Sequence, residues 1–265
     1  MSITVDTYPT LAEAASAMHD RSQFLGGGTM VVRGVNFGAQ DYDRIVRSTD
    51  AALREIRAEG SHLRIGAGVT MAQVMAAGGA EFLARVAQSV GGPAVRNMAT
   101  VGGNLFVRSP FGDFGVALLA LDAIVQMADG QSLPIETFYA QRDQLRGLVS
   151  AIDVPRPAHG AFRFCKATRT NPKGAAILSI AAHLPGGSRL GNTRLAFGAM
   201  GPTPLRAKEA ERALEGASLD KGGIQRALDV CLNGLSPQDD AIASEWYRRQ
   251  VAPVHLRRLL LDEER

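Results

Sequence analysis

Hydrophobic and polar residues follow helical spacing in some parts of the N-terminal half of the chain and strand spacing in others. Leu11, Ala14 and Met18 recur at helical spacing behind Thr10, with Glu13 placed to complete a capping box, so a helix is predicted over 10–21. Short strands are predicted over 23–25, 44–47, 53–57 and 63–67, and helices over 70–75 and 80–90. The second of these helices ends at Gly91-Gly92-Pro93, which cannot continue a helix.

The middle of the chain continues the mixture of helix and strand. Residues 115–122 are apolar on all sides, which predicts a buried helix. Two apolar runs around the turn Asp129-Gly130, at 123–127 and 133–135, predict a hairpin. A further strand is predicted over 148–154, before Pro155-Arg156-Pro157.

The pattern of predicted secondary structure changes beyond Pro157. Three longer strands are predicted there, followed mostly by helix from Ala207 onward. These strands span 161–167, 175–184 and 193–199. A sheet covered by helices forms an α+β unit of its own. We therefore expect an α+β chain with a domain boundary near residue 160. A hinge near 48–52 would divide the first domain into lobes of about 1–50 and 51–160.

Composition narrows the function classes. The 265 residues are 46% hydrophobic and 21% charged, enough for a substantial buried core. The net charge of +3 is a small excess spread along the chain, so nucleic-acid binding is not indicated. Cys165 and Cys231 lie far apart and predict neither a disulfide framework nor a metal site. No segment approaches the roughly 20 apolar residues of a membrane span, and no export signal is recognisable, so we expect a cytoplasmic chain.

The chemistry is indicated by two clusters of glycine. Gly26-Gly27-Gly28 and Thr29 follow a predicted strand, and Thr100-Val101-Gly102-Gly103-Asn104 forms a second predicted loop. Backbone N–H groups can hold a pyrophosphate where no Cβ keeps its oxygens away. A glycine-rich turn can also be no more than a tight turn. Neither cluster matches GxGxxG or GxxxxGK[ST], so nucleotide binding would require another fold.

A family resemblance supplies that fold. The strings Phe24-Leu25-Gly26-Gly27-Gly28-Thr29 and Ala99-Thr100-Val101-Gly102-Gly103-Asn104-Leu105, followed by Ser109-Pro110 and Asp113, resemble the FAD-binding subunits of the xanthine dehydrogenase and aerobic carbon monoxide dehydrogenase family. The similarity continues through 199–213 and 244–259, so it covers essentially the whole chain. It implies a two-lobed FAD-binding domain of the vanillyl-alcohol-oxidase type over 1–160. It also implies an α+β C-terminal domain, with a three-stranded sheet and helices, over 161–265.

The resemblance also implies which residues contact the cofactor. The first segment would contribute Phe24, Leu25, Gly26, Gly27, Gly28, Thr29, Met30 and Val31; the second Thr100, Val101, Gly102, Gly103 and Asn104; and single positions Val90, Asp113, Val149 and Lys166. Two departures concern loop detail, namely the lack of a proline after Thr29 and the bulky Phe106-Val107-Arg108. Because neither glycine cluster contains His or Cys, FAD is expected to bind non-covalently.

Two of these positions, and Phe164 near Lys166 in the sequence, have competing interpretations. Lys166 could stabilise the anionic reduced ring near the flavin pyrimidine, or be a solvated lysine at a strand edge. Asp113 could bind a hydroxyl of the ribityl or ribose, or cap the following helix. Phe164 could pack on the ring, although core packing is the simpler interpretation.

The resemblance implies an electron-transfer role. A molybdenum-binding large subunit would oxidise the substrate, an iron–sulfur small subunit with [2Fe–2S] clusters would relay electrons, and FAD in this chain would pass them to NAD, oxygen or a quinone. The molybdenum cofactor and the clusters are expected only in the partners. His19, His62, His159, His183 and His255 form no triad or metal spacing, so no catalytic side chain is predicted. The alternatives are a self-contained flavin oxidase or reductase and a cofactor-free scaffold.

Overall fold

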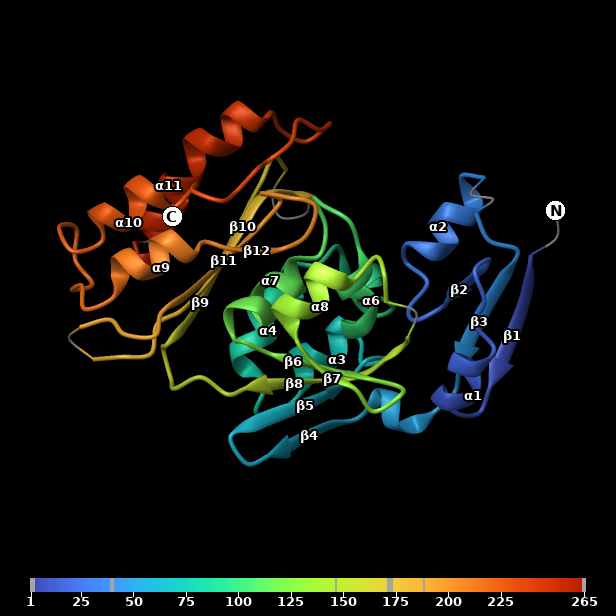
Figure 1. The fold of residues 1–265 in the computed structure, drawn as a ribbon. Coiled ribbons are helices and arrows are strands. Elements are labelled where there is room, and N and C mark those ends of the chain that lie inside the picture. The colour runs from blue at the N-terminus through green and yellow to red at the C-terminus, as the bar shows by residue number, and fades with distance from the viewer. Residues whose placement is uncertain (1–2, 39–40, 146, 171–173, 188, 264–265) are drawn as a thin grey trace.

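In the computed structural model, which describes residues 3–38, 41–145, 147–170, 174–187 and 189–263, the strands form three sheets that follow one another along the chain (Figure 1). The predicted mixture of helix and strand is confirmed. Most predicted strands are present within a residue or two of their expected positions.

The first lobe contains a three-stranded sheet in the order β1 (Thr4–Tyr8), β3 (Arg44–Ser48), β2 (Ser22–Phe24), with parallel pairing throughout its described residues. Parallel strands require crossovers, which contain α1 (Leu11–Ser16) and α2 (Val31–Asn36). The capping box of Thr10 and Glu13 is confirmed. The prediction that the helix continues to residue 21 is wrong, because a turn closes there, in which the Ser22 N–H donates to His19 O at 2.9 Å.

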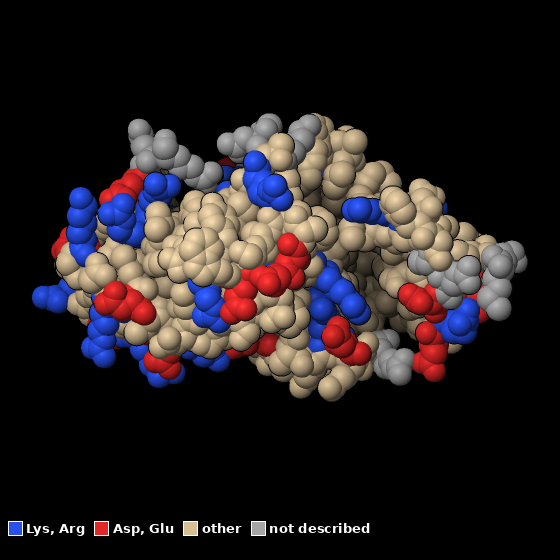
Figure 2. Space-filling model, turned by 90° about the horizontal axis from the view of Figure 1, so that it is seen from above, with Lys and Arg blue, Asp and Glu red and all other residues tan. Residues whose placement is uncertain are grey.

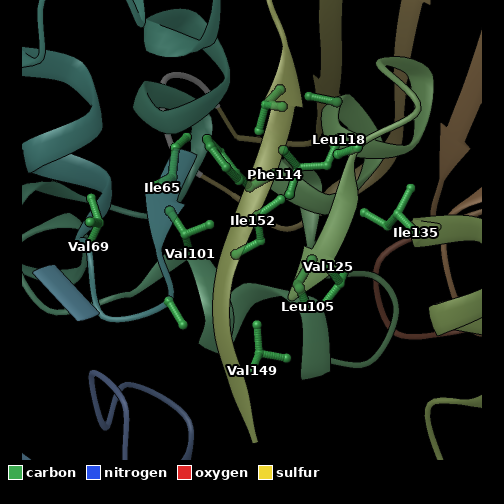
Figure 3. Close-up of a cluster of buried hydrophobic side chains, with 14 of the residues drawn as sticks. Ile65, Val69, Val101, Leu105, Phe114, Leu118, Val125, Ile135, Val149 and Ile152 are labelled. Atoms are coloured by element: carbon green, nitrogen blue, oxygen red, sulfur yellow. The ribbon is translucent and has the colours of Figure 1, made fainter. Parts of the chain in front are cut away.

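The second sheet is antiparallel, in the order β4 (Ile56–Glu59), β5 (His62–Gly66), β8 (Val149–Pro155), β6 (Ile124–Met127), β7 (Ser132–Pro134). The helical segments of this part are η1 (Ala51–Arg54), α3 (Met71–Ala76), α4 (Glu81–Ser89), α5 (Pro93–Arg96), α6 (Val101–Phe106), α7 (Asp113–Ala120) and α8 (Ile135–Gln141). Val101 and Leu105 of α6 and Phe114 and Leu118 of α7 join Ile152 of β8 in one buried cluster (Figure 3). This core fixes α6 and α7 against the sheet.

The strand predicted over 53–57 begins later than expected. Leu53 and Arg54 belong to the 3₁₀ helix η1, and β4 starts at Ile56. Asp50 causes the change, because its carboxylate accepts from the N–H of Ala52 at 3.0 Å and from that of Leu11 at 3.1 Å. The predicted hinge region is therefore a capped turn tied to α1.

The third sheet lies between two layers of helices (Figure 1). Its order is β12 (Leu205–Arg206), β11 (Arg194–Gly198), β10 (Ala176–His183), β9 (Phe162–Thr168), antiparallel throughout. The three predicted strands are confirmed, and the two-residue β12 adds a fourth to the described part of the sheet. On one face lies α7, and on the other α9 (Lys208–Leu214), α10 (Gln225–Val230) and α11 (Glu245–Leu261). Because both faces are covered, β10 is apolar at nearly every position.

One arginine holds the longest helix of the C-terminal part. The Arg248 side chain is 1% exposed, and it pairs with Asp240 at 2.8 Å. It also donates to the carbonyl oxygens of Ile177, Gln238 and Ala243. The guanidinium thus joins α11, β10 and the preceding loop. In the part of the chain that the structure describes, no helix is both long and apolar enough to cross a bilayer.

Replacing Arg248 with methionine tests this anchor. Arg248→Met leaves buried carbonyls without a donor and Asp240 without its cation, so we expect the free energy of unfolding to fall by roughly 2–4 kcal/mol. The matched control is Arg249→Met, which removes an exposed pair with Glu245 and should cost less than about 0.5 kcal/mol. Urea denaturation measures both. Equal losses in the two variants would contradict the assignment.

Candidate functional site

The first glycine segment, which follows β2, has backbone N–H groups without a protein acceptor among the described residues. Leu25 still belongs to the sheet, since its N–H donates to Val46 O at 2.8 Å. Within the described residues, no protein acceptor is recorded for the N–H groups of Gly26, Gly27, Gly28 and Thr29. Gly28 adopts a φ of 74°, which glycine allows without strain. Four consecutive donors, three of them on glycines that have no Cβ, suit an anion such as a pyrophosphate.

The second glycine segment is not the predicted loop. Val101–Phe106 is the helix α6, and Thr100 is its N-cap, with its hydroxyl oxygen accepting from the Gly103 N–H at 3.1 Å. The N–H groups of Val101 and Gly102 donate to Val69 O and Ala67 O, both at 2.8 Å. The expectation that this segment repeats the N–H cradle of the first is therefore wrong, because its donors already have protein acceptors.

The glycines of the second segment instead permit close packing. A Cβ on Gly102 would lie 2.7 Å from the Cβ of Ala67, which follows β5. A Cβ on Gly27 would overlap with the carbonyl oxygen of Met98, and a Cβ on Gly26 or Gly103 would lie 2.8 or 2.9 Å from the Thr100 hydroxyl oxygen. The two glycine segments thus meet at Thr100. We call this contact, made by Gly26, Gly27, Met98, Thr100 and Gly103, the glycine junction.

A hollow separates the first lobe from the rest of the molecule on the face seen in Figure 2. The glycine junction joins the two parts. Met98 was not predicted to belong to the site, since the backbone contact of one residue leaves no sequence signal. Ala67 was also missed, although its position in Gly66-Ala67-Gly68 is typical of a close backbone approach.

The helix α6 is also held at its C-terminal end. Arg142, whose side chain is 5% exposed, donates to Leu105 O at 3.3 Å and to Val107 O at 3.4 Å. A cation at this position satisfies carbonyl groups that a helix leaves unpaired. The position of α6 is therefore fixed from both ends. Arg142 was not predicted to contribute, because it is one of many dispersed arginines in the sequence.

Asp113 and Lys166 form a buried ion pair at 2.6 Å, with side chains 7% and 9% exposed. Lys166 also donates to Ser89 O at 3.0 Å, next to Val90. Asp113 is the first residue of α7, and Lys166 lies on β9 of the third sheet. The pair thus joins the start of α7 to the third sheet. The interpretation of Lys166 as a solvated lysine is wrong, because the sheet edge is covered here by α4 and α7.

Asp113 does not cap α7 either. The N-cap residue is Gly112, which has a φ of 94° and no side chain that could accept a hydrogen bond from the helix. The acceptor comes from Asn104, whose Oδ1 accepts from the N–H groups of Phe114 at 3.1 Å and Gly115 at 3.3 Å. The carboxylate of Asp113 therefore does not cap α7 and pairs with Lys166 instead.

The remaining predicted residues lie around these contacts. Phe24 ends β2, and Thr29 and Met30 lead into α2, which begins at Val31. Val90 is the C-cap of α4, and Val149 is buried at the start of β8 (Figure 3). Phe164 is 5% exposed and packs in the core, as the simpler interpretation predicted.

A depression of about 620 Å³ lies elsewhere, at the N-terminal end of α11. Among the described residues its walls include Arg169, Trp246 and Tyr247 and none of the predicted cofactor contacts. In the same residues, no group of three or more His, Cys, Asp or Glu side chains could hold a metal ion. The glycine junction and the Asp113–Lys166 pair therefore remain the candidate site.

Two family models together match almost the whole chain. "FAD binding domain in molybdopterin dehydrogenase" matches residues 3–157, and "CO dehydrogenase flavoprotein C-terminal domain" matches residues 162–262. The xanthine dehydrogenase FAD-binding subunit of Escherichia coli O157:H7 is 28% identical over 96% of this chain and 93% of its own length. The carbon monoxide dehydrogenase medium chain of Afipia carboxidovorans is 27% identical over 77% of this chain and 75% of its own length.

Solved structures share the fold. A chain of the carbon monoxide dehydrogenase from Hydrogenophaga pseudoflava superimposes with a TM-score of 0.88 at 22% identity, covering 98% of this chain and 96% of that one. A chain of quinoline 2-oxidoreductase from Pseudomonas putida 86 gives 0.87 at 22% identity, over 99% and 96%. The fold expected from the sequence resemblance is thereby confirmed.

The buried ion pair can be tested without a cofactor. Lys166→Met leaves the Asp113 carboxylate buried without a cation, so we expect the free energy of unfolding to fall by roughly 2–4 kcal/mol. Adding Asp113→Asn should recover most of this loss, because the amide carries no charge. The control is Lys208→Met, since Lys208 forms an exposed pair with Glu136; its loss should stay below about 0.5 kcal/mol. A double variant as unstable as Lys166→Met would refute the coupling.

Proposed function

The chain belongs to the family of FAD-binding domains in molybdopterin dehydrogenases, and we propose that it is the electron outlet of a multi-subunit molybdenum hydroxylase. The family makes it an oxidoreductase flavoprotein subunit. Bound FAD supplies two-electron redox chemistry and can exchange electrons singly. The observation that carries the proposal is the row of four N–H groups at Gly26 to Thr29, which have no acceptor among the protein residues that the structure describes.

The residues of the glycine junction fit this cofactor. A pyrophosphate carries two negative charges, and the N–H groups of 26–29 can hold its oxygens without a basic cluster. The second segment contributes close packing, because a Cβ on Gly26 or Gly103 would lie within 3 Å of the Thr100 hydroxyl oxygen. We propose that FAD extends from this junction between the two lobes. Val90, Asp113, Val149 and Lys166 would then lie toward the isoalloxazine and ribityl groups.

The Asp113–Lys166 pair changes the electrostatic role expected for Lys166. A lone lysine would add a full positive charge beside the flavin, but the carboxylate at 2.6 Å balances it. We therefore propose that Lys166 acts mainly as an oriented hydrogen-bond donor. It would add little to the positive electrostatic potential at the flavin. Its bond to Ser89 O fixes that orientation.

The partners are proposed from the family. Relatives carry the names "FAD-binding subunit" and "medium chain", which describe parts of larger enzymes. We propose an iron–sulfur small subunit and a molybdenum-binding large subunit as partners, and NAD, oxygen or a quinone as acceptor. The division into an FAD-binding domain over 1–160 and a C-terminal domain over 161–265 belongs to the same proposal. So does a cytoplasmic location, which suits a chain without a disulfide framework.

Purification tests the division of labour. The isolated chain should bind about one FAD and show flavin absorbance, but hydroxylate no substrate of the complex, since we propose that the molybdenum-binding large subunit oxidises the substrate. The complex purified with its partners should contain iron and molybdenum and be active. Turnover of a substrate by the isolated chain would instead support the self-contained flavin oxidase or reductase.

Substitution at Gly27 tests the cofactor site. Gly27→Ala places a Cβ onto Met98 O, so the glycine junction must open, and we expect FAD to be lost on gel filtration. Gly78→Ala is the matched control, because a Cβ there meets no atom within 4 Å, and it should retain FAD fully. Flavin absorbance per chain measures both. A Gly27→Ala protein as yellow as the control would exclude this position from the site.

A further inference from the structure

Asn104 lies between the two parts of the proposed cofactor site. It belongs to α6, four residues beyond the Thr100 cap, and it is 8% exposed. Its Oδ1 accepts from the N–H groups of Phe114 and Gly115 in the first turn of α7. Both partners are donors, so only the amide oxygen can face them, and the amide NH₂ is turned away from α7.

The start of α7 requires an acceptor from outside the helix. A helix leaves its first N–H groups unpaired, and a side chain at the N-cap usually accepts from them. Gly112 occupies the N-cap with a φ of 94°, a conformation that favours glycine, and it has no side chain that could cap the helix. Gly112 also packs against Asn104, since a Cβ there would lie 3.5 Å from Asn104 O. Asn104 therefore caps α7 from a neighbouring helix.

This cap connects the glycine junction to the ion pair. At one end of α6, Thr100 contacts Gly26 and Gly103. At the capped end of α7, Asp113 immediately precedes the two N–H groups that Asn104 accepts from, and it holds Lys166 at 2.6 Å. Because Asp113 is the first residue of α7, any movement of α7 relative to α6 would shift the carboxylate that pairs with Lys166. The Asn104 amide therefore fixes the distance between the two ends of the site.

We infer that Asn104 is a positioning residue, whose amide oxygen holds the Asp113–Lys166 pair at the correct distance from the glycine junction. The inference rests on the proposed FAD-binding function. The competing role is donation from the NH₂ group to the cofactor pyrophosphate. The two roles use opposite ends of the amide, so one isosteric substitution separates them.

Asn104→Asp keeps an oxygen that can accept from α7 and replaces the NH₂ with a negatively charged oxygen. A carboxylate at a helix N-terminus is stabilised by the helix dipole, so this variant should retain the cap. It cannot donate to a phosphate and would repel one. Asn104→Ala removes both functions. The full-length chain is stripped of FAD, and the FAD dissociation constant of each variant is measured by titration, with thermal unfolding of the apoprotein alongside.

For a positioning residue, Asn104→Ala should weaken FAD binding about tenfold or more and lower the apoprotein melting temperature. Asn104→Asp should restore both, with FAD affinity within about threefold of the wild type. A folded Asn104→Asp protein that loses FAD as completely as the alanine variant would overturn the inference in favour of direct ligation. Wild-type affinity in Asn104→Ala would overturn it as well.

The design separates this inference from the proposed function. If the wild-type chain does not bind FAD at all, the proposed function fails and the inference falls with it. If the wild type binds FAD and Asn104→Asp does not, only the inference fails. Should Asn104→Ala not fold, Asn104→Asp decides alone, because retained FAD supports positioning and lost FAD in a folded chain refutes it.

Discussion

A Cβ atom on Gly27 would overlap with the backbone of Met98, so the first lobe can meet the rest of the chain here only through glycine. This contact brings Gly26 and Gly103 close to the Thr100 hydroxyl oxygen, and among the described residues the adjoining N–H groups of Gly26 to Thr29 have no protein acceptor. The close approach of the two backbone segments and the binding of an anion by N–H groups both require residues without a Cβ. The glycine-rich segments therefore serve both the architecture and the proposed cofactor site.

The Asp113–Lys166 end of the proposed site is connected to the glycine junction through two short helices, α6 and α7. Thr100 and Arg142 hold the ends of α6, Asn104 caps α7 from α6, and Asp113 at the start of α7 pairs with Lys166 of the third sheet. Each step uses a buried polar group with its partner present, which is the condition for such groups to stabilise a fold. The C-terminal domain is thus joined to the FAD-binding part by a charged contact as well as by the apolar packing of α7 on β10 and β11.

Sequence predicted the family, the fold class and most strands, because period-two patterns and glycine strings are local signals. The assignment of Thr100 and Asp113 to the cofactor site stays a prediction. Sequence-based prediction failed where the outcome depends on distant residues. The segment after Thr100 was predicted as a loop, but Val69 O and Ala67 O accept its N–H groups and allow a helix. Lys166 could not be assigned to a buried pair, nor Asn104 to the cap of α7, because their partners are 53 and 10 residues away.

The central claim is that FAD binds across the glycine junction with its pyrophosphate on the N–H groups of Gly26 to Thr29. A crystal structure of the chain with FAD tests it most directly. The account predicts pyrophosphate oxygens within hydrogen-bonding distance of those N–H groups, about 2.7–3.2 Å from the nitrogen atoms, and the flavin ring on the side of Asp113 and Lys166. A pyrophosphate bound elsewhere, with these N–H groups still without an acceptor, would contradict it.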